Sequence, residues 1–319
     1  MTPKRVLLLG ATGTIGRATA KVLTDRGHQV VCPIRSEAPH LDGVETRQCN
    51  VTIPDAFRRD CVRNEPFDAI VSCLASRTGA PKDAWAIDYQ AHSDILAEAK
   101  RAGISQFVLL SAICVQKPKL AFQRAKLAFE AELRASGLDV SIVRPTAYFK
   151  SLSGQMDRVK SGKPFMVFGN GALTACKPIS DRDLANYLVD CVEDPTLRNR
   201  TLPIGGPGPA ITPLEQGALL FDSLNLEPRF TRVPVKLLDL VAGGLGALGV
   251  VSGQMRAKAE LAKIGRYYAT ESMLVWDPVK GRYDADATPE YGKDTLANHY
   301  IRLARGDVAA TLGDHAVFS

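Results

Sequence analysis

The segment Val6-Leu7-Leu8-Leu9-Gly10-Ala11-Thr12-Gly13-Thr14-Ile15-Gly16-Arg17 decides the fold of this chain. Its four apolar residues predict a short buried strand, three glycines follow at intervals of three, and the residues after them have helical periodicity. In such a strand–turn–helix, Gly10 supplies the torsion angles of the turn, Gly13 allows a pyrophosphate to approach the main chain, and Gly16 allows the helix to pack close to the strand. The segment therefore predicts a dinucleotide site at a helix N-terminus, where free N–H groups and the dipole favour an anion.

The glycines are spaced G-x-x-G-x-x-G rather than in the commoner pattern G-x-G-x-x-G. A glycine triplet alone is weak evidence, and an ordinary glycine-rich turn is the alternative. An ordinary turn does not need all three glycines, so the position between a strand and a helix favours the nucleotide interpretation. We expect the cofactor to contact Gly10, Thr12, Gly13, Thr14, Ile15, Gly16 and Arg17.

The composition is that of a soluble globular protein, with 319 residues, 45% hydrophobic and 23% charged. The 40 Lys and Arg residues outnumber the 34 Asp and Glu residues without a basic run, so nucleic acid is not an expected partner. Seven cysteines, never spaced C-x-x-C, predict reduced packing residues and no metal or cluster site. The N-terminus leads directly into the first strand without a signal peptide, so a cytoplasmic location is expected.

Strands and helices alternate along the first half of the chain. Further strands are predicted at residues 29–35, 44–51, 69–76, 107–113 and 141–146, and helices at 55–63, 85–102 and 119–135. This rhythm predicts an α/β fold with a Rossmann-like, doubly wound parallel sheet. Ligands bind beyond the carboxyl ends of such strands, where Ala75, Ser76 and Ser111 lie, so these residues are expected to contact the cofactor. Ser111 has an alternative role as a small residue required by close packing.

The alternation weakens near residue 151. We expect a nucleotide-binding domain in residues 1–150 and a smaller substrate lobe in residues 151–319, interleaved with the sheet. Residues 165–168 and 173–175 flank a Gly-Asn-Gly turn and predict a hairpin. Ser180, followed three residues later by Asp183, predicts a helix start.

Residues 240–255 carry no charge and include five glycines. As a helix this segment would span about 24 Å, short of the roughly 30 Å of a bilayer core, so it is not expected to cross a membrane. A pair of core helices and an apolar lid are the two alternatives for it.

The end of the second predicted strand distinguishes NADP from NAD. An NAD-specific site usually has an acid there, whereas this chain has Arg35. Arg35 and Arg17 together would suit a 2′-phosphate, which predicts NADPH as the cofactor. Glu37 is a competing acid two residues later, and two solvated surface arginines are the alternative interpretation.

The nucleotide-binding half resembles the atypical, extended short-chain dehydrogenase/reductase superfamily. Over nearly the whole chain, five blocks resemble the cluster-free, NADPH-using family of divinyl (proto)chlorophyllide 8-vinyl reductases: Phe107–Pro118, Phe122–Lys126, Ser141–Ser151, Ala175-Cys176-Lys177-Pro178-Ile179-Ser180 and Ile264–Met273. The resemblance implies reduction of the 8-vinyl group of a tetrapyrrole, divinyl chlorophyllide or protochlorophyllide, to ethyl in (bacterio)chlorophyll biosynthesis. An unrelated type of this reductase uses iron–sulfur clusters, and the scattered cysteines argue against that type.

One departure from the superfamily concerns the catalytic tyrosine, which usually precedes the lysine by four residues. Here Phe122 occupies that position, and the resemblance implies that Lys126 still holds the nicotinamide ribose. Reduction of a conjugated vinyl group generates no alkoxide, so the tyrosine is not needed for that purpose. The inner vinyl carbon must take a proton, and Tyr148, Lys126 and water are the alternatives. Tyr148 can equally be an aromatic wall residue.

Two functions of other classes remain open, and the missing tyrosine permits the first of them. They are a non-catalytic NADP-sensing regulator and a structural NADPH-binding subunit of a larger complex. A further alternative is an enzyme that reduces an isoprenoid or phenolic double bond. No obligate protein partner is indicated, and peripheral contact with a photosynthetic membrane is compatible with the sequence.

Overall fold

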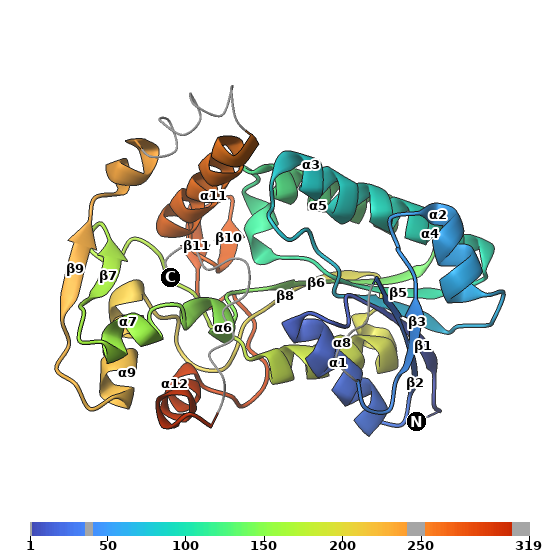
Figure 1. The fold of residues 1–319 in the computed structure, drawn as a ribbon, viewed down its shortest axis with the longest axis horizontal. Coiled ribbons are helices and arrows are strands. Elements are labelled where there is room, and N and C mark those ends of the chain that lie inside the picture. The colour runs from blue at the N-terminus through green and yellow to red at the C-terminus, as the bar shows by residue number, and fades with distance from the viewer. Residues whose placement is uncertain (1, 36–40, 241–252, 308–319) are drawn as a thin grey trace.

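The computed structural model describes residues 2–35, 41–240 and 253–307 (Figure 1). Within them, seven parallel strands form the central sheet in the order β3-β2-β1-β4-β5-β6-β8. The strands are β1 (Arg5–Leu9), β2 (Gln29–Ile34), β3 (Glu45–Gln48), β4 (Ala69–Ser72), β5 (Gln106–Leu110), β6 (Asp139–Pro145) and β8 (Arg200–Ile204). The order reverses between β1 and β4, which is the topological switch point where such sheets bind dinucleotides. The doubly wound fold is confirmed.

Helices cover both faces of this sheet (Figure 1). On one face α1 (Thr14–Asp25) and α8 (Asp181–Glu193) pack against alternate strand residues such as Val6 and Leu8. On the other face lie the π-helix η1 (Phe57–Val62), α4 (His92–Arg101) and α5 (Ala121–Arg134), which pack against Leu7 and Leu9. Successive strand residues point to opposite faces, so a strand covered on both faces is apolar throughout. That geometry explains the run of four apolar residues in β1.

Short helices fill the connections between these elements. They are α2 (Pro54–Ala56), α3 (Pro81–Ala84), the π-helix η2 (Trp85–Ala91) and the 3₁₀ helices η3 (Ile113–Gln116) and η4 (Pro195–Leu197). The predicted start of α8 is confirmed, because the Ser180 hydroxyl accepts a hydrogen bond from the Asp183 N–H at 3.0 Å.

A second group of elements lies to the left and top of Figure 1. It comprises α6 (Phe149–Leu152), α7 (Met156–Lys160), β7 (Phe165–Phe168), α9 (Pro213–Ser223), β9 (Phe230–Val233), α11 (Gly253–Thr270), β10 (Val275–Asp277), β11 (Arg282–Asp284) and α12 (Leu296–Arg305). Phe149, Phe165, Phe221 and Tyr300 are among the residues of its separate apolar core. Between β7 and α9 the chain returns to the sheet as α8 and β8.

The prediction of a hairpin around the Gly-Asn-Gly turn is wrong. Residues 165–168 form β7 and pair in parallel with β9, while residues 173–175 form no strand. The turn itself is present, with a φ of 78° at Gly171, but its flanking segments have other partners. The Gly171 carbonyl accepts from the Leu214 N–H at 3.1 Å, and Cys176 forms backbone bridges outside β7. These longer-range bonds override the local turn pattern.

Most of the uncharged segment 240–255 lies outside the described residues, which omit 241–252. In the part of the chain that the structure describes, no helix combines the length and apolar character needed to cross a membrane.

Candidate active site

The glycine turn has the shape that a bound dinucleotide requires. Gly10 has a φ of 73°, and a Cβ there would lie 2.7 Å from the backbone carbonyl carbon of Cys73. A Cβ on Gly16 would lie 2.1 Å from the Gly10 carbonyl oxygen, so both positions exclude a side chain. Gly13 is the exposed N-cap of α1, whose first turn contains no acid and no side-chain cap. The first N–H groups of the helix are therefore available to an anion, and the turn fits a dinucleotide pyrophosphate.

The two arginines predicted to bind a 2′-phosphate are both exposed near this turn. The Arg17 Nε donates to the Thr12 carbonyl at 2.9 Å, which holds the guanidinium against the turn. Arg35 directly follows β2. Neither arginine forms an ion pair with any residue that the structure describes, and Glu37 lies outside those residues. Within the described residues no acid neutralises their charges, which suits a phosphate ligand.

A buried carboxylate links two of the predicted cofactor residues. The Asp88 side chain has no exposed surface, and its Oδ1 lies 3.0 Å from the Lys126 Nζ. The Ser76 hydroxyl donates to the Asp88 Oδ2 at 2.6 Å, and the Ser76 N–H donates to Oδ1 at 3.2 Å. Three separate elements thus meet here: the segment after β4, η2 and α5. With these three donors the buried charge is compensated, and Lys126 is held in place next to the exposed Ala75 segment.

A buried histidine, His92, links the end of β4 to η2, next to this network. The His92 Nδ1 lies 2.8 Å from the Ile87 carbonyl oxygen, and its Nε2 lies 2.8 Å from the Ser72 Oγ. Burial, reinforced by the Lys126 charge, lowers the pKa of His92 to about 4 despite the bond to Ile87. The ring is therefore neutral at pH 7, with Nδ1–H donating to the carbonyl and Nε2 accepting from the Ser72 hydroxyl. Ile87 and Asp88 are neighbours in η2, so the hydrogen bond between His92 and Ile87 also helps to fix the position of Asp88.

The hydroxyl of Ser111 is engaged within the protein. Its Oγ donates to the Glu130 Oε1 at 2.6 Å. The Glu130 carboxylate has no exposed surface and also pairs with Arg134 at 2.6 Å and with Arg144. These contacts favour the packing role of Ser111, and its contact with the cofactor stays a prediction.

Tyr148 lies after β6 and forms a parallel backbone bridge with Ile179. Its side chain is half-buried, and burial raises the pKa of its hydroxyl, with the neighbouring Cys73 and Cys114 thiols adding to the effect. Among the described residues the Tyr148 hydroxyl has no hydrogen-bond partner. It is thus a protonated donor near the carboxyl ends of the strands.

An apolar surface adjoins Lys126, because Phe122 lies four residues earlier on the same face of α5. A Cβ on Gly79 would lie 3.1 Å from the Ile264 Cδ1 and 3.5 Å from the Phe122 Cδ1, so α11 packs against this part of the molecule. On the next turn of α11, Tyr268 is 44% exposed. We call Phe122, Ile264 and Tyr268 the aromatic surface.

Comparison with known proteins identifies the family of this chain. The family model described as NAD(P)H-binding matches residues 10–195. A divinyl chlorophyllide a 8-vinyl-reductase, chloroplastic, from Cucumis sativus is 48% identical over 98% of this chain and 79% of its own length. The protein of the same name from Arabidopsis thaliana is 47% identical over 95% of this chain and 78% of its own length. The chain belongs to the divinyl chlorophyllide a 8-vinyl-reductase family.

Membership in this reductase family makes the protein an oxidoreductase, and the NAD(P)H-binding match confirms a nicotinamide cofactor. A nucleoside-diphosphate-sugar epimerase from Staphylococcus aureus has a similar structure, with a TM-score of 0.69 over 93% of this chain and 99% of that chain. Its sequence identity is 15%, so this likeness concerns the fold alone.

In this member of the reductase family, the segment Cys176–Ser180 ties the second group of elements to the sheet. The Lys177 Nζ pairs with the Glu290 Oε1 at 2.6 Å. A Cβ on Gly206 would lie 1.9 Å from the Pro178 carbonyl oxygen, so the chain after β8 passes directly against this segment. This block, one of the five on which the resemblance rests, is therefore a structural junction.

Glu271 forms a second junction, between the segment that precedes α5 and the C-terminal elements. The Lys117 Nζ lies 2.7 Å from its Oε2, Lys119 bonds its Oε1, and the Tyr283 hydroxyl donates to Oε2 at 2.6 Å. Burial opposes ionisation, but these donors outweigh it and lower the pKa of Glu271 to about 2. The buried carboxylate thus holds α11 and β11 against the residues that lead into the Lys126 helix.

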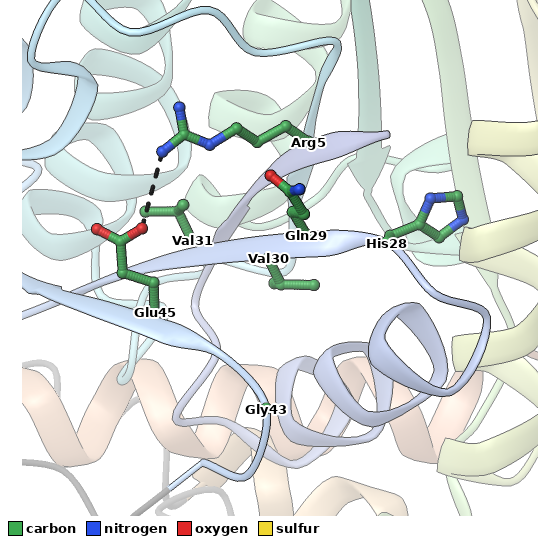
Figure 2. Close-up of a pocket in the computed structure, with 7 residues that line it drawn as sticks. All are labelled: Arg5, His28, Gln29, Val30, Val31, Gly43 and Glu45. Carbon is green, nitrogen blue, oxygen red and sulfur yellow. Dashed lines mark ion pairs between the residues drawn. The ribbon is translucent and has the colours of Figure 1, made fainter. Parts of the chain in front are cut away.

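A pocket of about 420 Å³ lies at the opposite end of the strands (Figure 2). It is lined by Arg5, His28, Gln29, Val30, Val31, Gly43 and Glu45. Arg5 and Gln29 begin β1 and β2, so the pocket is remote from the glycine turn that follows β1. Its polar side chains have partners within the protein: Arg5 pairs with Glu45 at 3.7 Å, and the His28 ring contacts Glu193 at 3.0 Å. The pocket is therefore separate from the candidate site.

Sequence reasoning missed two residues at the site, Asp88 and Lys150. Asp88 lies on a segment whose apolar positions alone predicted a helix, and nothing in the spacing pairs it with Lys126. The Lys150 Nζ donates to the Thr14 Oγ1 at 2.8 Å, at the first residue of α1. A signal for Lys150 was available, because a cation directly after the carboxyl end of a predicted strand lies at the ligand-binding edge.

Proposed function

We propose that this protein uses NADPH to reduce the 8-vinyl group of divinyl chlorophyllide or protochlorophyllide to ethyl in (bacterio)chlorophyll biosynthesis. The observation that carries the proposal is the identity of 48% over nearly the whole chain with a reductase of that name. The geometry agrees with it, since the glycine turn fits a dinucleotide and the exposed Arg17 and Arg35 fit the 2′-phosphate of NADPH.

The chemistry is a two-electron reduction of a carbon–carbon double bond. When bound, NADPH supplies a hydride for the terminal vinyl carbon, while a proton reaches the inner carbon, and the products are the ethyl group and NADP⁺. Lys126, fixed by Asp88, binds the nicotinamide ribose and adds positive charge next to the macrocycle, which takes up negative charge during the reaction. Tyr148 supplies the proton, because its hydroxyl is protonated and has no partner among the described residues, and water can replace it.

The substrate lies against the aromatic surface in this proposal. A chlorin is a large, flat and mostly apolar ligand, and Phe122, Ile264 and Tyr268 present aromatic and aliphatic groups next to Lys126. Residues 1–150 then bind the cofactor, and residues 151–319 supply most of the substrate wall. Because the substrate is poorly soluble, we also propose that the protein collects it in the cytoplasm at the surface of a photosynthetic membrane.

The test is conversion by purified protein. With NADPH and divinyl chlorophyllide, the product should be heavier by two hydrogens, its Soret band should move to shorter wavelength, and one NADPH should be consumed per molecule. Reactions without a cofactor and with NADH serve as controls, as does protochlorophyllide as the second substrate. If neither tetrapyrrole is converted while the protein still binds NADPH, the reductase proposal fails. A non-catalytic NADP-sensing regulator or a structural NADPH-binding subunit would then replace it.

A further inference from the structure

Lys150 is a cation that reaches the glycine turn from the second group of elements. It lies on α6, and its Nζ donates to the Thr14 Oγ1 at 2.8 Å. The lysine side chain is half-buried. Among the described residues no carboxylate lies within ion-pair distance of it, so nothing in that part of the protein neutralises its charge.

The electrostatics at this place favour an anion. The N-terminus of α1 carries a partial positive charge, and the Lys150 ammonium adds a full one at the first helical residue, Thr14. The first turn of α1 contains no acid and no side-chain cap that would offset them. A negative group between these two positive charges would relieve their mutual repulsion, and phosphate suits both an ammonium and free backbone N–H groups.

The position of Lys150 is fixed by its neighbours along the chain. Phe149 is only 4% exposed and packs in the apolar core of the second group of elements, with its ring 5.2 Å from that of His299. The Phe149 N–H donates to the Ile179 carbonyl at 3.2 Å. The ammonium therefore approaches α1 from a rigid backbone and is not a mobile surface side chain.

We propose that Lys150 binds a phosphate oxygen of the cofactor's pyrophosphate, so that α6 contributes directly to cofactor binding. The inference deepens the proposed function and rests on it for the identity of the cofactor. Its consequence differs from that of Arg17 and Arg35. Those arginines would contact the 2′-phosphate and make the site selective for NADPH over NADH. Lys150, in contrast, strengthens the binding of both dinucleotides to the same extent.

The experiment compares four ligands by calorimetric titration: NADPH, NADH, ADP-ribose and adenosine 2′-monophosphate. Lys150→Gln keeps an N–H donor for Thr14 and removes the charge, and Lys150→Met keeps the aliphatic stem. Either variant should weaken the three pyrophosphate ligands by roughly ten- to a hundredfold and change adenosine 2′-monophosphate binding less than about twofold. Lys150→Arg should recover most of the affinity. Lys21→Gln, an equal charge change at a 76% exposed residue of α1, should have no effect.

The outcomes separate this inference from the reductase proposal, because no titration needs a tetrapyrrole. Unchanged binding of NADPH and NADH in both charge-removing variants would overturn the role of Lys150. So would an equal loss for adenosine 2′-monophosphate, because that result would mean that the site as a whole had shifted. The predicted pattern would stand even if no vinyl group were reduced.

Discussion

Replacing Asp88 by Asn should remove the counter-ion of Lys126 and leave the shape of the site unchanged. The carboxylate, which has no exposed surface, accepts two hydrogen bonds from Ser76 and one from the Lys126 Nζ at 3.0 Å. An amide oxygen can still accept from Ser76, but Lys126, only 12% exposed, would lose its opposite charge. Breaking a fully buried pair costs about 3–5 kcal/mol. Because Lys126 reaches solvent, we expect about 2–3 kcal/mol, which for a chain of this length lowers the unfolding midpoint by roughly 3–5 °C.

Activity should fall as well, because a displacement of about 1 Å at a positioned group can cost roughly a hundredfold in rate. If Asp88 acts through Lys126, the double variant with Lys126→Met should be no slower than Lys126→Met alone. Asp83→Asn is the matched control, since that carboxylate lies on the neighbouring α3 and accepts from Thr78 at 2.9 Å, away from Lys126. Thermal melting and kcat/KM for vinyl reduction are the measurements. Full activity in Asp88→Asn, or a double variant far slower than Lys126→Met, would refute the reasoning.

Arg35→Ala should raise the KM for NADPH by roughly ten- to over a hundredfold, because one charge-assisted phosphate contact is lost, and leave the KM for NADH nearly unchanged; equal losses would make Arg35 structural. Activity should need no metal, since the described residues contain no cluster of metal-ligating groups. Stoichiometric iron in anaerobically purified protein, with activity lost on chelation, would overturn that expectation. Lys126→Ala should be nearly inactive while Tyr148→Phe keeps a measurable rate, because water can replace a phenol as proton source; a fully active Lys126→Ala would remove the lysine from the mechanism. The pKa of Glu271 is lowered from 4.5 to about 2, so its charge stabilises the folded state above pH 4.5, and that contribution is lost as the pH falls towards 2. Denaturant titrations of Glu271→Gln and of the unmodified protein should therefore converge over this range, and a gap independent of pH would contradict the assignment.

The glycine turn could be predicted because its constraints are local. Gly10 needs a positive φ, and Gly16 must lie against the Gly10 carbonyl, whatever the rest of the chain does. The two strand-end serines could not be told apart in the same way. Ser76 and Ser111 have similar sequence surroundings, but Ser76 bonds the carboxylate beside Lys126, whereas Ser111 bonds Glu130, one helical turn further along α5. Which carboxylate each serine meets depends on how distant helices pack.

Long-range pairing explains the remaining differences between sequence and structure. The Gly-Asn-Gly turn correctly marks a change of direction, but the partner of β7 is β9, far along the chain. Asp88 lies on the same buried stripe as Ala84, Ala91 and Ile95, next to Lys126, and a pattern of apolar residues does not reveal a carboxylate that shares their face. A local pattern determines an element, and the packing of several elements determines the site.

The late return of the chain to the sheet has an evolutionary consequence. Strand β8 covers the outer edge of β6, and α8 covers the face of the sheet that includes Val6 and Leu8, yet both come after α6, α7 and β7. A polypeptide ending at residue 150 would keep the whole glycine turn but expose a bare strand edge and an apolar face, both of which promote aggregation. Residues 1–150 are therefore not a cofactor module that is complete without the later part of the chain. A cofactor module exchanged between relatives would therefore have to include α8 and β8, which follow part of the substrate lobe in the chain.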